Sequence, residues 1–143
     1  MAASKTYLVP VDFSKSSEIA LNQAIQMARE NRGKLLLVHV ISATFAFPLK
    51  AGFSDIFETL EKNARESMTK LLQRKRLKPT RDRSILITGL DPAQAIVSQA
   101  KKSRASMIIM GSHGRTGLQK FLLGSVAERT LRYAHCPVLI VKK

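Results

Sequence analysis

The sequence predicts an α/β fold, a single doubly wound five-stranded parallel sheet in the strand order 3-2-1-4-5 with helices on both faces. Short apolar runs alternate along the chain with segments of helical periodicity, which is typical of β-α-β units joined by right-handed crossovers. A length of 143 residues fits one domain, so we expect residues 1–143 to share one core. In such a sheet the ligand lies where the strand order reverses, here between the first and fourth strands.

The first strand and helix follow from a short stretch near the start of the chain. Residues 7–11 are an apolar run that predicts a strand. Ser14 or Ser16 can cap the following helix, because either side chain can accept a hydrogen bond from a backbone N–H of its first turn. The apolar positions of this helix share one face, and we expect it to end at Gly33.

The middle of the chain predicts two more strands and a long helix. Residues 35–41 are apolar on both faces, as in a strand covered by helices on each side. From about Ser54, apolar side chains recur every three to four residues and predict a helix whose end carries a basic run. Residues 84–89 form the third predicted strand.

A third helix has three start signals that coincide. Asp91 can cap it, Pro92 stands at its first position, and Gln94 follows three residues after the cap. Residues 106–111 then form the fourth predicted strand. Together these elements lead directly into a glycine-rich segment.

The last helix and strand close the pattern. Ser125 and Glu128 have the spacing of a capping box, so we expect a helix that begins at Ser125. The sequence CPVLIVKK, residues 136–143, predicts a short final strand.

The segment 110–125, MGSHGRTGLQKFLLGS, holds four of the seven glycines. It matches neither the Walker A loop nor the dinucleotide fingerprint, whose glycines follow the first strand. Glycines let backbone N–H groups approach an anion closely, and the start of a helix adds unpaired N–H groups and the positive end of its dipole. The segment therefore predicts phosphate binding. The alternative is a long turn in which Ser125 is an ordinary cap.

The stretches VPVDFS, LLLVHV, GLDPAQAIV and IIMGSHGRTGLQKFLLGSVAERTLRYAHCPVLIV resemble the universal stress proteins of the UspA type over nearly the whole chain. ATP-binding members of that family carry the pattern G-2x-G-9x-G-[ST], and Gly111, Gly114, Gly124 and Ser125 match it without a gap. The resemblance implies the adenine nucleotide α-hydrolase-like form of the fold. It also implies ATP as the bound cofactor, with or without magnesium.

The same resemblance implies roles for individual residues. Asp12 would contact the adenine and ribose region, and Pro10, Val11 and Val40 would line the base pocket. The positions around the ribose and phosphates would be Met110, Gly111, His113, Gly114, Arg115, Gly124, Ser125 and Val126. Family members are commonly dimers joined through the last strand, which implies a homodimer through Val138 to Val141.

Several of these residues also have simpler interpretations. Asp12 can serve as a turn or cap residue for the first helix, and both roles can coexist. Arg115 is favoured over Lys120 as a fork for phosphates, although either side chain can be solvated. His39 stands within an apolar strand, where a hydrogen-bonded core histidine is the expected interpretation.

The charge of the chain is not explained by the resemblance. Lys and Arg total 24 against 10 Asp and Glu, and the net charge of +14 predicts attraction to anionic partners at low salt. Residues 70–83 hold seven basic residues and one acid, Asp82, but no aromatic residue that could stack on bases. A solvated helix face is the simpler interpretation. Weak contact with nucleic acid or an acidic protein stays open.

Composition also limits the cell compartment and the chemistry. No apolar run is long enough to cross a membrane, no signal peptide is recognisable, and the single Cys136 cannot form an intramolecular disulfide, so we expect a cytoplasmic protein. The histidines and the cysteine lack the spacing of a metal site, and no metal or catalytic residue is predicted. Asp12 is nearly the only acid expected in the crevice, so we expect at most slow ATP hydrolysis.

Three functions follow from the sequence. The first is a universal stress protein that binds ATP and acts as a nucleotide-dependent switch in a stress response or in signalling. The second is a dimeric interaction protein of the same fold that uses no nucleotide. The third, an adaptor for anionic partners, rests on charge alone.

Overall fold

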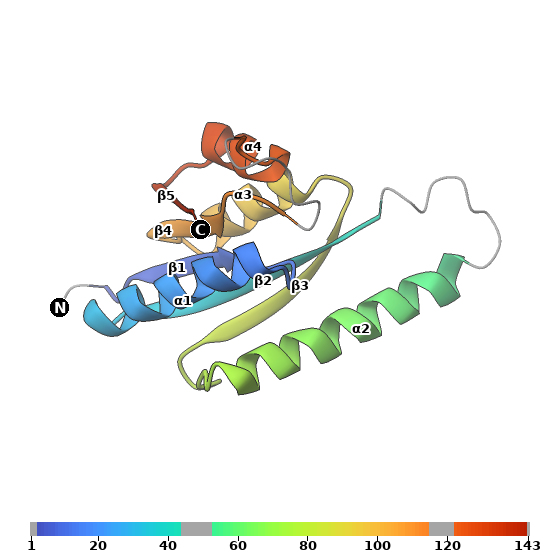
Figure 1. Ribbon diagram of the computed structural model, residues 1–143, viewed down its shortest axis with the longest axis horizontal. Coiled ribbons are helices and arrows are strands. Elements are labelled where there is room, and N and C mark those ends of the chain that lie inside the picture. The colour runs from blue at the N-terminus through green and yellow to red at the C-terminus, as the bar shows by residue number, and fades with distance from the viewer. Residues whose placement is uncertain (1–2, 44–52, 115–121, 143) are drawn as a thin grey trace.

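The computed structural model describes residues 3–43, 53–114 and 122–142. Within these residues strands and helices alternate as the sequence predicts (Figure 1). The elements are β1 (Thr6–Pro10), α1 (Lys15–Glu30), β2 (Lys34–Ser42), α2 (Phe53–Arg74), β3 (Arg83–Gly89), α3 (Pro92–Lys102), β4 (Met107–Gly111), α4 (Ser125–Tyr133) and β5 (Val138–Val141).

The five strands form one parallel sheet in the order β3-β2-β1-β4-β5, which confirms the predicted fold class. Thr6 of β1 pairs with Lys34 of β2, and Tyr7 pairs with Met107 of β4. Two hydrophobic clusters cover the two faces of the sheet: α1 and α2 pack on one, and α3 and α4 on the other (Figure 1). The reversal of strand order between β1 and β4 therefore lies at the centre of the sheet.

The start of α1 settles one alternative and its end corrects a prediction. Ser14 is the cap, since its side chain accepts a hydrogen bond from the Ser17 amide. The helix ends at Glu30, and the residue in the left-handed conformation is Arg32, with φ 52°, not Gly33. Gly33 has a different reason to be glycine, because a Cβ there would lie 2.7 Å from the ring of Tyr7.

The starts of α3 and α4 differ in how well the sequence predicts them. Asp91 caps α3 as expected, but the Gln94 side chain bonds Ser98 instead of turning back toward the cap. The predicted Ser125 cap is wrong: Gly124 is the cap residue, without a side-chain cap bond, and Ser125 is the first residue of α4. The reason is that the Gly124 amide donates to the carbonyl of Ser112 at 2.7 Å, which fixes where the chain enters the helix.

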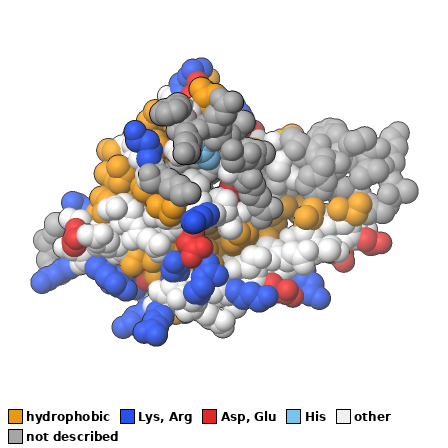
Figure 2. Space-filling view, in the orientation of Figure 1, with side chains coloured by type: hydrophobic (Ala, Val, Ile, Leu, Met, Phe, Trp, Pro, Cys, Tyr) orange, Lys and Arg blue, Asp and Glu red, His pale blue; other side chains and the backbone are white. Residues whose placement is uncertain are grey.

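The positive charge is unevenly spread over the surface. Figure 2 shows Lys and Arg side chains gathered on the left and lower sides of the view, where Figure 1 shows the ends of α1 and α2. Of the described part of the chain, no helix is long and apolar enough to span a membrane.

Candidate functional site

A cavity of about 480 Å³ opens where β1, β2 and β4 end and where α1, α3 and α4 begin. This volume falls within the range of small-molecule sites, roughly 300–1,000 Å³. We call it the β1–β4 cavity. It is lined by Pro10, Val11, Asp12, Ser17, Val38, His39, Val40, Ser42, Pro92, Ile96, Met110, Gly111, Ser112, His113, Gly114, Gly124, Ser125, Val126 and Ala127.

Every predicted site residue that the structure describes lines the β1–β4 cavity. They are Pro10, Val11, Asp12, Val40, Met110, Gly111, His113, Gly114, Gly124, Ser125 and Val126. Arg115, and with it Lys120, lies outside the described residues. Residues from the first, second and fourth strands therefore meet at the position where the strand order reverses.

Asp12 stands at the mouth of the cavity in the turn between β1 and α1. Its Oδ1 accepts a hydrogen bond from the Ser14 amide at 2.9 Å, so the turn role foreseen for this residue is present. Its Oδ2 faces the glycine-rich segment, since a Cβ on Gly114 would lie 3.3 Å from that oxygen. One oxygen of the carboxylate thus maintains the turn while the other faces Gly114.

The glycines bring the chain closer to its neighbours than a side chain would allow. A Cβ on Gly111 would lie 2.8 Å from the carbonyl oxygen of Ser16, at the start of α1. A Cβ on Gly124 would lie 3.1 Å from the carbonyl oxygen of Ser112. The amide of Gly124 donates to that same carbonyl, so the two ends of the segment 112–124 meet beside the cavity.

The first turn of α4 forms one wall of the cavity. Ser125, Val126 and Ala127 line it, and their amides have no partner within the helix because a helix leaves its first N–H groups unpaired. The positive end of the helix dipole acts in the same place. The wall therefore has the features of an anion site, with backbone donors and a positive field.

An ion pair beside the cavity fixes α4 against α3. The guanidinium of Arg129 contacts both carboxylate oxygens of Asp91, the residue that caps α3. Hydrogen bonds from Arg129 hold the pKa of Asp91 below its ordinary value, and Asp91 in turn raises the pKa of Arg129. This contact joins the starts of the two helices that form one side of the cavity.

Comparison with known proteins identifies the family. The model of the universal stress protein family matches residues 4–142. The chain belongs to the universal stress protein family. Universal stress protein MJ0531 of Methanocaldococcus jannaschii is 35% identical over 141 residues, covering 97% of this chain and 82% of the relative.

Solved structures of the family share this fold. The structure of MJ0577 from the same organism superposes with a TM-score of 0.85 at 32% identity, covering 97% of this chain and 96% of that one. A crystal structure of a universal stress protein in complex with cAMP superposes with a TM-score of 0.63 at 25% identity, covering 99% and 98%.

The cavity of this universal stress protein contains residues that sequence reasoning missed. They are Ser17, Val38, His39, Ser42, Pro92, Ile96, Ser112 and Ala127. Ser42 ends β2, and Pro92 begins α3, so the rule that ligands lie at carboxyl strand ends could have found both. His39 was interpreted as a core residue, and its Nδ1 does lie 2.7 Å from the carbonyl oxygen of Val11, yet the side chain also reaches the cavity.

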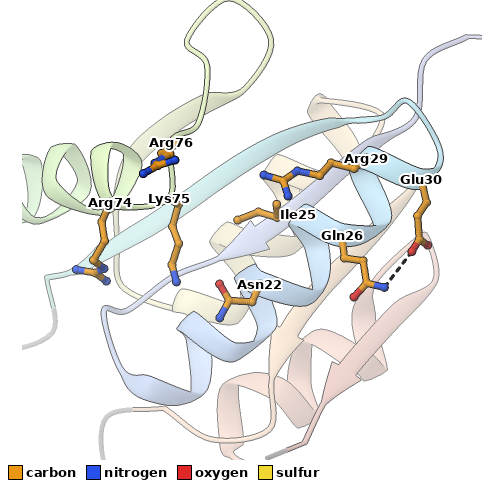
Figure 3. Close-up of a pocket in the computed structure, with 8 residues that line it drawn as sticks. All are labelled: Asn22, Ile25, Gln26, Arg29, Glu30, Arg74, Lys75 and Arg76. Atoms are coloured by element: carbon orange, nitrogen blue, oxygen red, sulfur yellow. Dashed lines mark hydrogen bonds between the residues drawn. The ribbon is translucent and has the colours of Figure 1, made fainter.

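A second cavity, of about 550 Å³, lies between α1 and the end of α2 (Figure 3). We call it the α1–α2 groove. It is lined by Asn22, Ile25, Gln26, Arg29, Glu30, Arg74, Lys75 and Arg76. No glycine lines it, and it lies beside helix ends whose backbone carbonyls bear the negative end of the dipole. It lacks the backbone donors of the β1–β4 cavity.

The described residues of this universal stress protein contain no group of three or more His, Cys, Asp or Glu side chains that could hold a metal. Burial raises the pKa of the Cys136 thiol, so the thiol stays protonated at neutral pH. Cys136 is partly buried against the hydrophobic cluster on the α3–α4 face of the sheet.

Proposed function

We propose that this universal stress protein binds ATP in the β1–β4 cavity and acts as a nucleotide-dependent switch in a stress response or in signalling. The observation that carries the proposal is the meeting of Gly111, Gly114 and the start of α4 at the reversal of strand order. Support also comes from the related universal stress protein crystallised in complex with cAMP, an adenine nucleotide.

The lining residues suit the parts of a nucleotide. Pro10, Val11 and Val40 offer an apolar wall for the base. Asp12 Oδ2, which faces Gly114, would accept a hydrogen bond from a ribose hydroxyl. The amides of Ser125 and Val126 would donate to phosphate oxygens. We assign Met110 and His113 to the same ribose and phosphate region, and Arg115 to the phosphates.

Magnesium would be held mainly by the phosphates of the nucleotide. Of the described residues that line the cavity, Asp12 is the one carboxylate, and its Oδ1 is already engaged with the Ser14 amide. Magnesium commonly keeps several waters and binds through one or two carboxylates plus substrate phosphates. The same shortage of carboxylates supports at most slow hydrolysis.

The switch rests on the junction between Ser112 and Gly124. Phosphates bound at the start of α4 would hold both ends of the segment 112–124 and alter the surface offered to a protein partner. Hydrogen exchange of this segment, measured with and without ATP, tests the idea. Equal exchange in both states would rule out the switch while leaving binding itself intact.

We also propose a homodimer through β5. In the described sheet β5 is an edge strand, and all four of its residues, Val138 to Val141, are half-buried. An apolar edge with an unpaired row of backbone groups is a natural place for a second copy to pair. We further propose that residues 1–143 form one domain of a cytoplasmic protein, supported by the single sheet and by the presence of one cysteine, which cannot form an intramolecular disulfide.

Calorimetric titration with ATP tests the site. Asp12→Asn keeps an acceptor for the Ser14 amide but removes the charge, whereas Asp12→Ala removes both. We expect each to weaken ATP binding by roughly tenfold or more, which corresponds to about 1.4 kcal/mol, and only Asp12→Ala to lower the melting temperature. Unchanged ATP affinity in both variants would refute the assignment of Asp12.

A pair of glycine variants distinguishes a specific effect on ATP binding at Gly114 from the general effect of adding a methyl group. Gly114→Ala puts a methyl group 3.3 Å from Asp12 Oδ2, inside the cavity, and should weaken ATP binding. Gly89→Ala is the control, because its methyl group would meet only ordinary contacts, the nearest at 3.7 Å from Ala95. Native mass spectrometry of the purified protein reports bound nucleotide and subunit count together. A chain that retains and binds no nucleotide would favour the nucleotide-independent interaction protein.

A further inference from the structure

Three helices end in the same unusual way. After α1, α2 and α3, the residue in the left-handed conformation is an arginine: Arg32, Arg76 and Arg104, with φ of 52°, 54° and 52°. After each arginine, the amide of the next residue donates the hydrogen bond that closes a Schellman motif. These amides belong to Gly33, Leu77 and Ala105, and they donate to the carbonyls of Ala28, Leu72 and Ala100 in that order. Glycine is the usual residue at this position because it has no Cβ to strain.

Helix capping does not explain these arginines. A cation near the end of a helix does interact favourably with the dipole. Each of the three helices, however, already has cations in its last turn, Arg29 in α1, Arg74 in α2, and Lys101 and Lys102 in α3. The additional arginine therefore adds charge at a position where the backbone favours glycine.

The three arginines belong to one continuous surface at the amino ends of the strands. Ser106, two residues after Arg104, exchanges hydrogen bonds with Thr6, next to Lys5. Lys34 in turn donates its amide to the carbonyl of Lys5. This chain of contacts runs from the end of α3 across β1 to β2.

The same surface continues across β2 to β3. The Leu35 amide donates to the carboxylate of Asp82, and Asp82 also accepts from the Lys78 amide, which joins β2 to the turn after α2. The surface crosses four strands, about 14 Å at the usual strand spacing. We call it the basic edge. It comprises Lys5, Arg32, Lys34, Arg76, Lys78, Arg81, Arg83, Lys101, Lys102 and Arg104, all of them exposed.

Acidic residues barely offset the charge of the basic edge. Asp82 is only 5% exposed, and it is occupied by backbone amides and by Arg81. Glu30 accepts a hydrogen bond from Gln26 on its own helix. The basic edge continues past Arg76 into the α1–α2 groove, which Arg29 on α1 and Arg76 just after α2 both line (Figure 3).

We propose that the basic edge binds the phosphate backbone of double-stranded nucleic acid without reading its sequence. A duplex carries about one negative charge per 1.7 Å of its axis, which suits an extended row of cations. The site lies at the opposite ends of the strands from the β1–β4 cavity and does not depend on the nucleotide function proposed above.

The composition of the basic edge selects a duplex over two other polyanions. Binding of single strands relies on aromatic side chains that stack on bases, and the basic edge contains none. Protein partners are usually held by large apolar or aromatic anchors near the centre of the contact. None of the exposed large apolar residues of the described chain, which are Ile56, Leu90, Leu122, Leu131 and Tyr133, is among the residues of the basic edge.

The test compares two triple variants of the full chain by the salt dependence of binding to a short labelled DNA duplex, without ATP. In the first, Arg32→Gly, Arg76→Gly and Arg104→Gly remove three charges from the basic edge while giving each backbone its preferred residue. In the control, Lys62→Gln, Arg65→Gln and Arg132→Gln remove three charges from the exposed faces of α2 and α4. Net charge is equal in the two variants, and the charges are lost from different places on the surface. In the control, the loss of Arg65 and Arg132 also leaves Glu61 and Glu128 without their ion-pair partners.

We expect the wild-type chain to bind with an affinity that falls steeply between roughly 50 and 200 mM salt. The glycine variant should have a log–log salt slope shallower by about 2.7, because each phosphate contact contributes about 0.9. The control should keep the wild-type slope. Absence of duplex binding by the wild-type chain, or equal changes in both variants, would overturn the proposal.

Polyglutamate of matched charge is the second probe. If polyglutamate binds more tightly than the duplex, and if the glycine variant no longer binds polyglutamate, then the partner is an acidic protein and the nucleic-acid proposal is wrong. Weaker binding of polyglutamate than of the duplex supports the proposal. Because ATP is absent throughout, failure of ATP binding in the earlier experiments would not alter these outcomes.

Discussion

The two ends of the sheet use glycine and arginine in opposite ways. At the carboxyl ends of the strands, Gly111 and Gly124 stand where a Cβ would crowd a neighbouring backbone. At the amino ends, Arg32, Arg76 and Arg104 occupy positions where the backbone would favour glycine. The comparison shows two different reasons for a residue type. Gly111 and Gly124 lie where there is no space for a Cβ, whereas the three arginines place positive charge at left-handed positions that glycine would occupy with less strain.

The largest expected effect is at the carboxyl end. Gly111→Ala would put a methyl group 2.8 Å from the carbonyl oxygen of Ser16. That oxygen belongs to the backbone, so it cannot move aside as a flexible side chain could. We expect the free energy of unfolding to fall by about 3 kcal/mol, the upper range for forced overpacking. Urea denaturation measures it, with Gly89→Ala as the control that should lose little. A wild-type midpoint for Gly111→Ala would mean that this close approach is not required.

At the amino end, substitution should raise the free energy of unfolding instead of lowering it. Replacing Arg32, Arg76 and Arg104 with glycine relieves left-handed strain of about 1 kcal/mol each and loses about 0.3 kcal/mol each of dipole interaction. The triple variant should therefore be more stable by about 2 kcal/mol in low salt. A loss of stability would show that these arginines serve the fold, which would weaken the contrast between the two ends.

A smaller effect is expected within α4, which forms a wall of the β1–β4 cavity. The hydroxyl of Thr130 is fully buried and has no hydrogen-bond partner among the described residues. Thr130→Val removes the unsatisfied group and should raise the free energy of unfolding by about 1 kcal/mol. Thr69→Val in α2 is the matched control, because the Thr69 hydroxyl donates to the Arg65 carbonyl and its loss should bring no gain.

The smallest effect concerns the ion pair between Asp91 and Arg129. Because the folded protein holds the pKa of Asp91 below its ordinary value of 3.8, the pair contributes stability above that pH. This contribution is lost as the pH falls through the lowered pKa. Asp91→Asn keeps an N-cap side chain but removes the charge, so it should be slightly less stable than wild type at neutral pH.

A pH series of thermal melts checks this last expectation. The difference between wild type and Asp91→Asn should shrink as the pH falls below 3.8, since Asp91 becomes protonated in the wild-type chain as well. A difference that stays constant across the series would show that the charge of Asp91 is not what stabilises the junction of α3 and α4.

The fold was predictable because its signals are local and repeated. Apolar runs such as 35–41 identify buried strands without any knowledge of the rest of the chain, and Asp91 with Pro92 marks a helix start by itself. The rules of β-α-β connections indicated right-handed crossovers but not the strand order. The order 3-2-1-4-5 was adopted as a doubly wound arrangement, and the sheet confirms it.

The errors arise where distant contacts decide the local structure. Gly33 resembled a helix end, but the ring of Tyr7 accounts for it, and Arg32 takes the left-handed position instead. The helix begins at Ser125 as predicted, but its cap is Gly124 and not Ser125, and Gly124 is held there by a hydrogen bond to Ser112. Neither contact leaves a trace in the neighbouring sequence.

The lining of the β1–β4 cavity likewise divides into residues that local sequence signals indicate and residues that depend on distant contacts. The meeting of residues 10–12 with residues 111–114 was expected from the sequence, whereas Ser42 at the end of β2 was missed. Ser17 and Ile96 reach the cavity from helices whose rotation about their axes depends on packing. The sequence indicated the basic edge only through the net positive charge and the basic run at residues 70–83. Its continuity depends on contacts between β1, β2 and the end of α3, which join residues far apart in the chain.

The hydrogen bond from the Gly124 amide to the Ser112 carbonyl also has a consequence for engineering. Because this bond joins the residue after β4 to the residue that caps α4, it can open only if those two elements separate. The Gly124 amide is therefore a built-in reporter of the junction beside the β1–β4 cavity. An isotopic label on Gly124 would let a sensor read the state of that junction without any change to the chain.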